Sequence, residues 1–142
     1  MIYLMGSLKN PKIPAIANSL RKKGFDVFDE WFAAGPTADR HWKAYAQGRG
    51  LPYREALNLP FVTTAFDFDM KHLALCEAGV MVMPCGKSAH VELGLFIGSR
   101  RKMFILHDGE PEGDDWELMP KIATAMAYDI DELVAQMKEH GL

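Results

Sequence analysis

The sequence predicts an α/β protein with a mostly parallel sheet and helices on both faces of that sheet. Three observations predict this class. Short apolar runs that end in loops alternate with longer segments whose apolar residues recur at helical spacing. Two runs and a helical segment between them lie within residues 2–28, and such units build parallel sheets. The length of 142 residues and the hydrophobic share of 49% fit one domain with a substantial core.

The first unit begins with the apolar run 2–5, which is too short for a helix and stops at Gly6. In residues 13–23, Ile13, Ala17 and Leu20 recur on one helical face, and Gly24 stands where such a helix ends. Residues 25–28 resume a strand. We therefore expect a strand, a helix and a strand in this order.

Residues 29–59 depart from this alternation because glycine and proline interrupt them. We interpret the segment as an insertion with one or two short helices. It is also rich in aromatic residues, namely Trp31, Phe32, Trp42, Tyr45 and Tyr53. Two interpretations stay open: the aromatic side chains pack an irregular loop onto the body, or they stack on a planar ligand.

The second half of the chain returns to the alternation. Thr63 or Thr64 is expected as the N-cap of a helix that runs to Cys76. Residues 79–84 form the most hydrophobic run of the chain, which predicts the central strand of the sheet. After the loop 85–88 we expect a helix over 89–99 and another buried strand over 103–106.

The C-terminal part begins with an acidic loop over residues 108–115. Residues 116–124 fit a helix, and residues 125–128 fit a fifth strand. Asp129 and Glu132 have the spacing of a capping box, so a terminal helix is expected over 130–140. The whole chain, residues 1–142, is then one flavodoxin-like or Rossmann-like domain with four or five strands.

Composition and charge disfavour several classes of function. The 16 Lys and Arg residues against 19 Asp and Glu give a net charge of −3, which disfavours a general nucleic-acid binder. No apolar stretch approaches the ~18 residues that span a bilayer, and the N-terminus lacks the features of a signal peptide. The two cysteines, Cys76 and Cys85, are too few for a disulfide framework. We expect a soluble, cytoplasmic protein with neither membrane nor nucleic-acid partners.

The carboxyl ends of the strands are where ligands of such sheets bind, which brings Gly6, Ser7, Asp29 and the loop 85–88 to the working edge. Glu92 follows this loop, in the expected first turn of the helix over 89–99. A catalytic role and a structural role compete here, because acidic residues also favour helix N-termini electrostatically.

Two aspartates, Asp67 and Asp69, lie early on the preceding helix. Two residues apart on a helix, they project about 200° from each other, so only one is expected to face the cleft. If Asp69 and Glu92 converge, they form a carboxylate pair that can break a glycosidic bond, one as nucleophile and one as proton donor. Asp67 is kept as a candidate substrate contact.

Other chemistries have little support in the sequence. His90 and Glu92 match half of a zinc-deaminase motif, but the required downstream cysteine pair does not occur. Neither a glycine-rich dinucleotide motif nor a P-loop occurs. Cys85 lies near a helix N-terminus, but no histidine stands in a recognisable partner position. We therefore expect no metal and no cofactor.

Four segments carry a resemblance to a known family: IYLMGS at 2–7, the helix with Asp69, GVMVMP at 79–84, and SAHVELG at 88–94 followed by RRK at 100–102. Together they resemble the nucleoside 2-deoxyribosyltransferase superfamily, which includes the deoxynucleoside 5′-monophosphate N-glycosidases. The most specific motif is the E-L-G turn at 92–94. The resemblance covers most of the chain except the insertion 29–59.

The resemblance implies an enzyme that cleaves the N-glycosidic bond of a deoxynucleoside, a nucleoside or a nucleoside 5′-monophosphate. It implies that Glu92 attacks the anomeric carbon and forms a glycosyl-enzyme ester. Asp69 then assists the leaving base, and Tyr3 orients the nucleophile. The acceptor in the second step, water or another base, distinguishes a hydrolase from a transferase, and the sequence does not fix it.

Around the sugar and its 5′ substituent, the resemblance implies a loop formed by Gly6 and Ser7. Gly86 departs from the family pattern, because the nucleoside transferases have an aspartate there and the monophosphate hydrolases a serine. The departure favours a 5′-monophosphate, for which Lys87 and Ser88 offer a cation and a hydroxyl. These two residues also fit a solvated lysine and a helix N-cap, so both interpretations stay open.

Family members are homo-oligomers whose sites are completed by a neighbouring subunit, and residues 116–119 occupy the corresponding region. Met119 is therefore a candidate substrate contact. Two alternatives to this enzyme remain: a nucleotide-binding sensor on the same scaffold without turnover, and a glycohydrolase directed at NAD.

Overall fold

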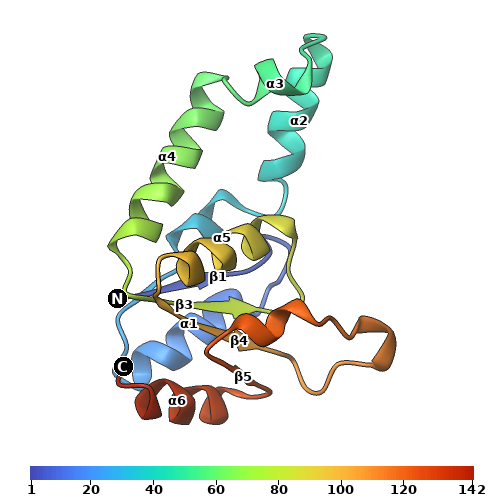
Figure 1. Cartoon of the computed structure of the whole chain (residues 1–142). Coiled ribbons are helices and arrows are strands. Elements are labelled where there is room, and N and C mark those ends of the chain that lie inside the picture. The colour runs from blue at the N-terminus through green and yellow to red at the C-terminus, as the bar shows by residue number, and fades with distance from the viewer.

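The computed structural model describes residues 1–142 and contains one five-stranded parallel sheet in the order β2-β1-β3-β4-β5 (Figure 1). The strands are β1 (Ile2–Met5), β2 (Val27–Phe28), β3 (Ala78–Val82), β4 (Lys102–Leu106) and β5 (Ala125–Ala127). This is the strand order of flavodoxin-like sheets, in which the chain reverses direction along the sheet between β1 and β3. The predicted fold class and the predicted central strand are confirmed.

Helices cover both faces of the sheet (Figure 1). One face packs against α1 (Ile13–Lys22) and α6 (Ile130–Glu139), and the other against α5 (Lys87–Gly98) and the C-terminal end of α4 (Pro60–Leu75). Alternation along β1 divides the core, because Leu4 belongs to the cluster with α1 and Tyr3 to the cluster with α5. The strands are short and buried, so their apolar runs predicted them well.

The sequence predicted N-capping residues for two helices, and only one of these predictions is correct. At α6 the predicted cap is present, since the Asp129 carboxylate accepts a hydrogen bond of 2.8 Å from the Glu132 amide. The prediction for α4 was wrong, because this helix begins at Pro60. Thr64 is not an N-cap; its hydroxyl donates to the Pro60 carbonyl at 2.9 Å. Proline is suited to a first helical position because it has no amide hydrogen to leave unpaired.

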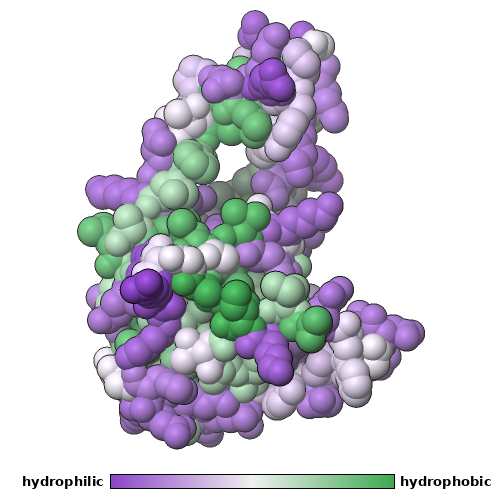
Figure 2. All heavy atoms as spheres, in the orientation of Figure 1, coloured by the Kyte–Doolittle hydropathy of each residue, from purple (hydrophilic) through white to green (hydrophobic).

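The predicted insertion contains a 3₁₀ turn, η1 (Glu30–Ala34), and two helices, α2 (Ala38–Gly48) and α3 (Tyr53–Ala56). Together with the N-terminal half of α4, α2 and α3 form an arm that projects from the sheet (Figure 1). Figure 2 shows an opening between α2 and α4. The arm buries little: Ala46 is the one buried residue of α2, and Ala56 that of α3.

Of the two interpretations of the aromatic side chains of the insertion, packing onto the body describes the first of these residues. Trp31 packs against both core clusters, and its Nε1 donates to the Leu4 carbonyl at 2.6 Å. On the arm, Tyr45 meets Phe61 edge-on at 5.5 Å, whereas Tyr53 is 73% exposed. The first aromatic residues therefore anchor the insertion to the body, and those farther along it do not.

Residues 116–124 do not form the single helix that was expected. The structure has two 3₁₀ turns in this region, η2 (Gly113–Asp115) and η3 (Met119–Ile122). Pro120, in the middle of the segment, has no amide hydrogen for an α-helical bond. None of the protein's helices combines the length and the apolar character needed to cross a membrane.

Candidate functional site

A cavity of about 670 Å³ opens at the carboxyl ends of β1 and β3, between α2, α4 and α5. We call it the carboxylate cavity. Seven of the ten predicted site residues line it, namely Tyr3, Gly6, Ser7, Asp69, Gly86, Ser88 and Glu92. Asp67, Lys87 and Met119 are not among its lining residues. Asp29 lies elsewhere and is ion-paired with Arg21.

Glu92 reaches the cavity from α5. Its position on this helix distinguishes a catalytic role from a structural role at the helix N-terminus. The helix begins at Lys87, two residues earlier than predicted, so Glu92 is in the second turn. No acidic residue occupies the first turn. The electrostatic benefit of an acidic side chain at a helix N-terminus fades beyond the first turn, so it does not account for Glu92.

Asp69 reaches the cavity from α4, while Asp67 is exposed on another side of that helix. The end of α4 is fixed to the sheet by Arg101, whose guanidinium donates to the carbonyls of Leu73 and Cys76. These bonds satisfy carbonyl groups that the end of a helix leaves without partners. They help to hold the helix that carries Asp69.

Tyr3 lies on β1 with its ring packed in the core below the cavity. The ring centroid is 5.2 Å from that of Phe28 and 6.3 Å from that of Phe96, and the residue is 1% exposed. Gly6, just after β1, is closely packed, because a Cβ there would lie 2.7 Å from Cδ1 of Ile13 and would displace that side chain. The sheet therefore sets the position of Tyr3, and α1 packs closely against the loop that follows it.

The two carboxyl groups are desolvated and repel each other. Burial, together with the negative charge of Asp69, raises the pKa of Glu92 to about 7. Burial also raises the pKa of Asp69, and nearby His72 partly opposes this effect. Burial and the charges of Glu92 and Asp69 raise the pKa of the Tyr3 hydroxyl. None of the four ion pairs of the protein includes Glu92 or Asp69.

Cys85 is closer to a histidine than the sequence indicated, since its Sγ lies 3.8 Å from Nδ1 of His90. The same Nδ1 lies 2.9 Å from the Gly86 carbonyl, which can only accept, so this nitrogen carries a hydrogen and does not act as a base. Burial raises the pKa of Cys85 to about 11, and this keeps the thiol protonated. The arrangement does not support a thiolate nucleophile. No three His, Cys, Asp or Glu side chains are grouped so that they could hold a metal ion.

One wall of the carboxylate cavity comes from the arm, and sequence reasoning did not identify these residues. The helix α2 and its N-cap supply most of this wall, with Thr37, Asp39, Arg40, Lys43, Ala44 and Gln47. Thr37, Arg40, Lys43 and Gln47 recur at spacings of three and four residues, which brings them to one helical face. This polar periodicity was the signal that could have revealed them.

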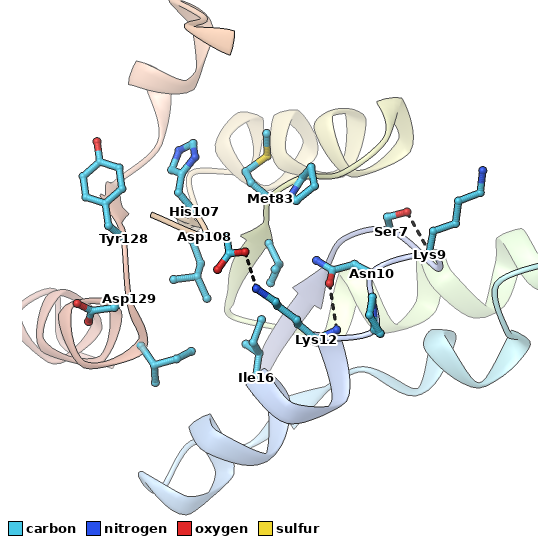
Figure 3. A pocket seen from close by; sticks show the side chains of 15 residues that line it. Ser7, Lys9, Asn10, Lys12, Ile16, Met83, His107, Asp108, Tyr128 and Asp129 are labelled. Carbon is cyan, nitrogen blue, oxygen red and sulfur yellow. Dashed lines mark hydrogen bonds and ion pairs between the residues drawn. The ribbon is translucent and has the colours of Figure 1, made fainter. Parts of the chain in front are cut away.

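A second cavity, of about 510 Å³, lies at the same edge of the sheet on the other side of the loop between β1 and α1 (Figure 3). Ser7 and Lys9 line both cavities. In the second cavity Lys12 points toward Asp108 and forms an ion pair with it (Figure 3). His107 and Tyr128 contribute a tilted ring pair with centroids 5.7 Å apart.

No family model matches this sequence, and no curated protein matches it either.

Proposed function

We propose that the protein cleaves the N-glycosidic bond of a nucleoside or nucleoside 5′-monophosphate, with the 2′-deoxy form preferred. The observation that carries the proposal is the meeting of Glu92, Asp69 and Tyr3, from three different elements, in one desolvated cavity. A pair of carboxyl groups at a cleft is what glycoside cleavage requires, one as nucleophile and one as proton donor. The residues that line the cavity support this chemistry without a metal or cofactor.

The reaction takes place in two displacements. In the first, an oxygen of the Glu92 carboxylate attacks the anomeric carbon, the carbon–nitrogen bond breaks, and the base leaves with its electron pair and a proton from Asp69. In the second, water or another base attacks the same carbon, the ester bond breaks, and Glu92 regains its carboxylate. The proton released by the acceptor returns to Asp69. Two inversions retain the configuration of the sugar.

Tyr3 is assigned a positioning role. Its ring is held by Phe28 and Phe96, and its hydroxyl stays protonated because burial and the two carboxylates raise its pKa. A protonated hydroxyl can donate a hydrogen bond to an oxygen of Glu92 and fix the other oxygen for attack. A hydrogen bond of this kind limits rotation of the carboxylate and brings the attacking atom into line.

The proposal is tested by incubating the protein with nucleosides, deoxynucleosides, their 5′-monophosphates and NAD, and by following free base by chromatography. We expect base release from at least one nucleoside, deoxynucleoside or 5′-monophosphate. Rapid quenching followed by intact-mass measurement is expected to show protein heavier by the glycosyl group, with the added mass on Glu92. Release of nicotinamide from NAD alone would favour the NAD-directed enzyme, and binding without base release would favour a sensor.

We further propose that the protein forms a homo-oligomer. Hydrophobic side chains gather over α5 and the lower part of α4 (Figure 2). Phe66 and Met70 on α4, and Val91 and Leu95 on α5, are exposed and lie one helical turn apart in each pair. An apolar surface of this kind is typical of a protein interface. Light scattering at micromolar concentration is expected to give at least a dimer, and a monomer mass would contradict the proposal.

A further inference from the structure

The lining of the carboxylate cavity combines acidic and basic residues. Glu92 and Asp69 line it from α5 and α4, and Lys9, Arg40 and Lys43 line it from other elements. Lys9 comes from the loop after β1, and the other two come from α2. A site with half-buried carboxyl groups from two helices and cations from other elements suits a ligand with an anionic group some distance from its reacting bond.

The three cations have no carboxylate partner in the protein. Its four ion pairs join the N-terminus to Glu77, Lys12 to Asp108, Arg21 to Asp29, and Lys23 to Asp131. Asp39 also lines the wall, and it forms no ion pair with Arg40 or Lys43. Lys43 stands 5.7 Å from the ring of Trp42, a contact that leaves its charge available. The positive charge of this wall is therefore free to meet a ligand.

Packing does not explain why α2 has these residues at this place. The helix buries one side chain, that of Ala46, and its N-cap makes no side-chain hydrogen bond. Arg40 and Lys43 are exposed and lie three residues apart, so they share one face of the helix. This face lines the carboxylate cavity, so a ligand in that cavity can explain its charges.

We infer that α2 is an anion-recognition helix, and that Arg40, Lys43 and Lys9 bind a phosphate group of the substrate. This inference rests on the proposed function and specifies its substrate class as phosphorylated nucleosides. A guanidinium binds two phosphate oxygens at once, and lysines add positive charge around the same group. The cavity volume of about 670 Å³ lies within the range of sites that enclose ligands of this size.

The cations of this site are not the one that the sequence predicted. Lys87 was expected to supply the cation for a 5′-phosphate, but it does not line the cavity, whereas Ser7 and Ser88 do. The hydroxyls of these serines remain available to the phosphate or to the sugar. The cations come instead from the insertion, the part of the chain that the family resemblance does not cover.

The test compares kcat/KM for deoxynucleoside 5′-monophosphates with kcat/KM for the matching deoxynucleosides. It uses the natural protein, the double variant Arg40→Ala with Lys43→Ala, and the control Arg49→Ala. Arg49 caps the same helix and stacks on Tyr45 outside the cavity. We expect the double variant to lose about 10- to 100-fold in kcat/KM for the monophosphates, the equivalent of one charged hydrogen bond, and less than about 3-fold for the nucleosides. Arg49→Ala is expected to change neither value.

A binding measurement separates failure of this inference from failure of the proposed function. Calorimetry with the Glu92→Gln protein needs no chemistry, and we expect the monophosphate to bind more tightly than the nucleoside unless Arg40 and Lys43 are both replaced. If the natural protein releases no base but this preference holds, the proposed function fails and the anion site stands. Equal binding of both ligands, or a preference that Lys87→Ala removes and the double variant keeps, overturns the inference.

Discussion

Two cavities lie at one edge of the sheet and are separated by one loop, but they differ in whether their charged side chains form ion pairs. In the second cavity, Lys12 and Asp108 neutralise each other, and Asp129 is engaged as the N-cap of α6. In the carboxylate cavity, Glu92 and Asp69 have no cationic partner and are more deeply desolvated. The same scaffold therefore pairs Lys12 with Asp108 on one side and leaves Glu92 and Asp69 without ion pairs on the other.

The difference indicates which side is maintained for function. An unpaired buried carboxylate reduces the stability of the folded state, because burial disfavours its charged form. For Glu92 the shift from an ordinary value of 4.5 to about 7 corresponds to about 3 kcal/mol at neutral or alkaline pH. Perturbed titratable groups in a cleft are typical of active sites, whereas an exposed ion pair is typical of an ordinary surface.

The largest expected effect is the loss of turnover when the unpaired carboxylate of Glu92 is replaced. Glu92→Gln keeps the shape of the side chain but removes the nucleophilic oxygen, so base release is expected to fall by at least about 10³-fold. The matched change in the second cavity, Asp108→Asn, is expected to alter the rate less than twofold. Steady-state assays of free base measure both. A folded Glu92→Gln protein with unaltered base release would refute the mechanism.

The next largest effect concerns Asp69 as proton donor. General acid catalysis contributes about 10²–10⁴-fold, so Asp69→Asn is expected to slow substrates with poorly leaving bases by about 10²-fold or more. Substrates whose base leaves without protonation are expected to lose much less. A series of substrates with leaving bases of different pKa, assayed in both proteins, gives this comparison. Equal losses along the series would indicate that Asp69 has a structural role only.

One side of this contrast, the carboxylate cavity, could be predicted from the sequence, because strands and edge residues follow local rules. The runs at β1 and β3 are short and apolar, and residues that follow parallel strands come to one edge of the sheet. Glu92 and Asp69, carried by different helices, could therefore be expected to face each other. The predicted start of α4 was wrong. The Thr64 hydroxyl bonds back to the Pro60 carbonyl inside the helix, and local preference does not decide between this bond and an N-cap.

The contribution of the arm could not be predicted for a different reason. The helix α2 buries only Ala46, so little burial fixes its orientation against the sheet. The spacing of Arg40, Lys43 and Gln47 marks one polar face, but it does not show whether that face meets a cavity or solvent. Lys87 was favoured instead because it lies beside Gly86 and Ser88 in the sequence, but neighbouring side chains of a helix point in different directions.

The stability of the Glu92→Gln protein is expected to rise as its activity falls. A carboxyl group with a raised pKa in the folded state costs nothing below its unfolded pKa near 4.5, and the cost grows until the pH passes about 7. The variant is therefore expected to gain up to about 3 kcal/mol over the natural protein between pH 4.5 and pH 8. Urea unfolding at the two pH values measures this gain, with exposed Glu117→Gln as the control. A gain that does not depend on pH would contradict burial of an unpaired charge.

The pH dependence of activity tests which carboxyl group attacks. With a substrate whose base leaves without protonation, only Glu92 has to be ionised, so kcat/KM is expected to rise about tenfold per pH unit below pH 7 and to level off above it. Asp69→Asn removes a negative neighbour that raises the pKa of Glu92, and the rise is therefore expected to move to lower pH. Activity with this substrate that does not change as the pH increases through 7 would show that Glu92 is not the nucleophile.

The smallest expected effect lies in the second cavity, where charge is already paired. The side chains of Lys12 and Asp108 are 59% and 65% exposed, and an ion pair with this exposure contributes about 0–1 kcal/mol. Replacing Lys12 with Met, Asp108 with Asn, and both together should give a coupling energy below about 1 kcal/mol in urea unfolding. None of the three variants is expected to change kcat/KM for base release. The two cavities share Ser7 and Lys9, so a large loss of kcat/KM in Lys12→Met would mean that the substrate extends past that loop. The second cavity would then belong to the same site, and the contrast between the cavities would be one between two ends of a single ligand.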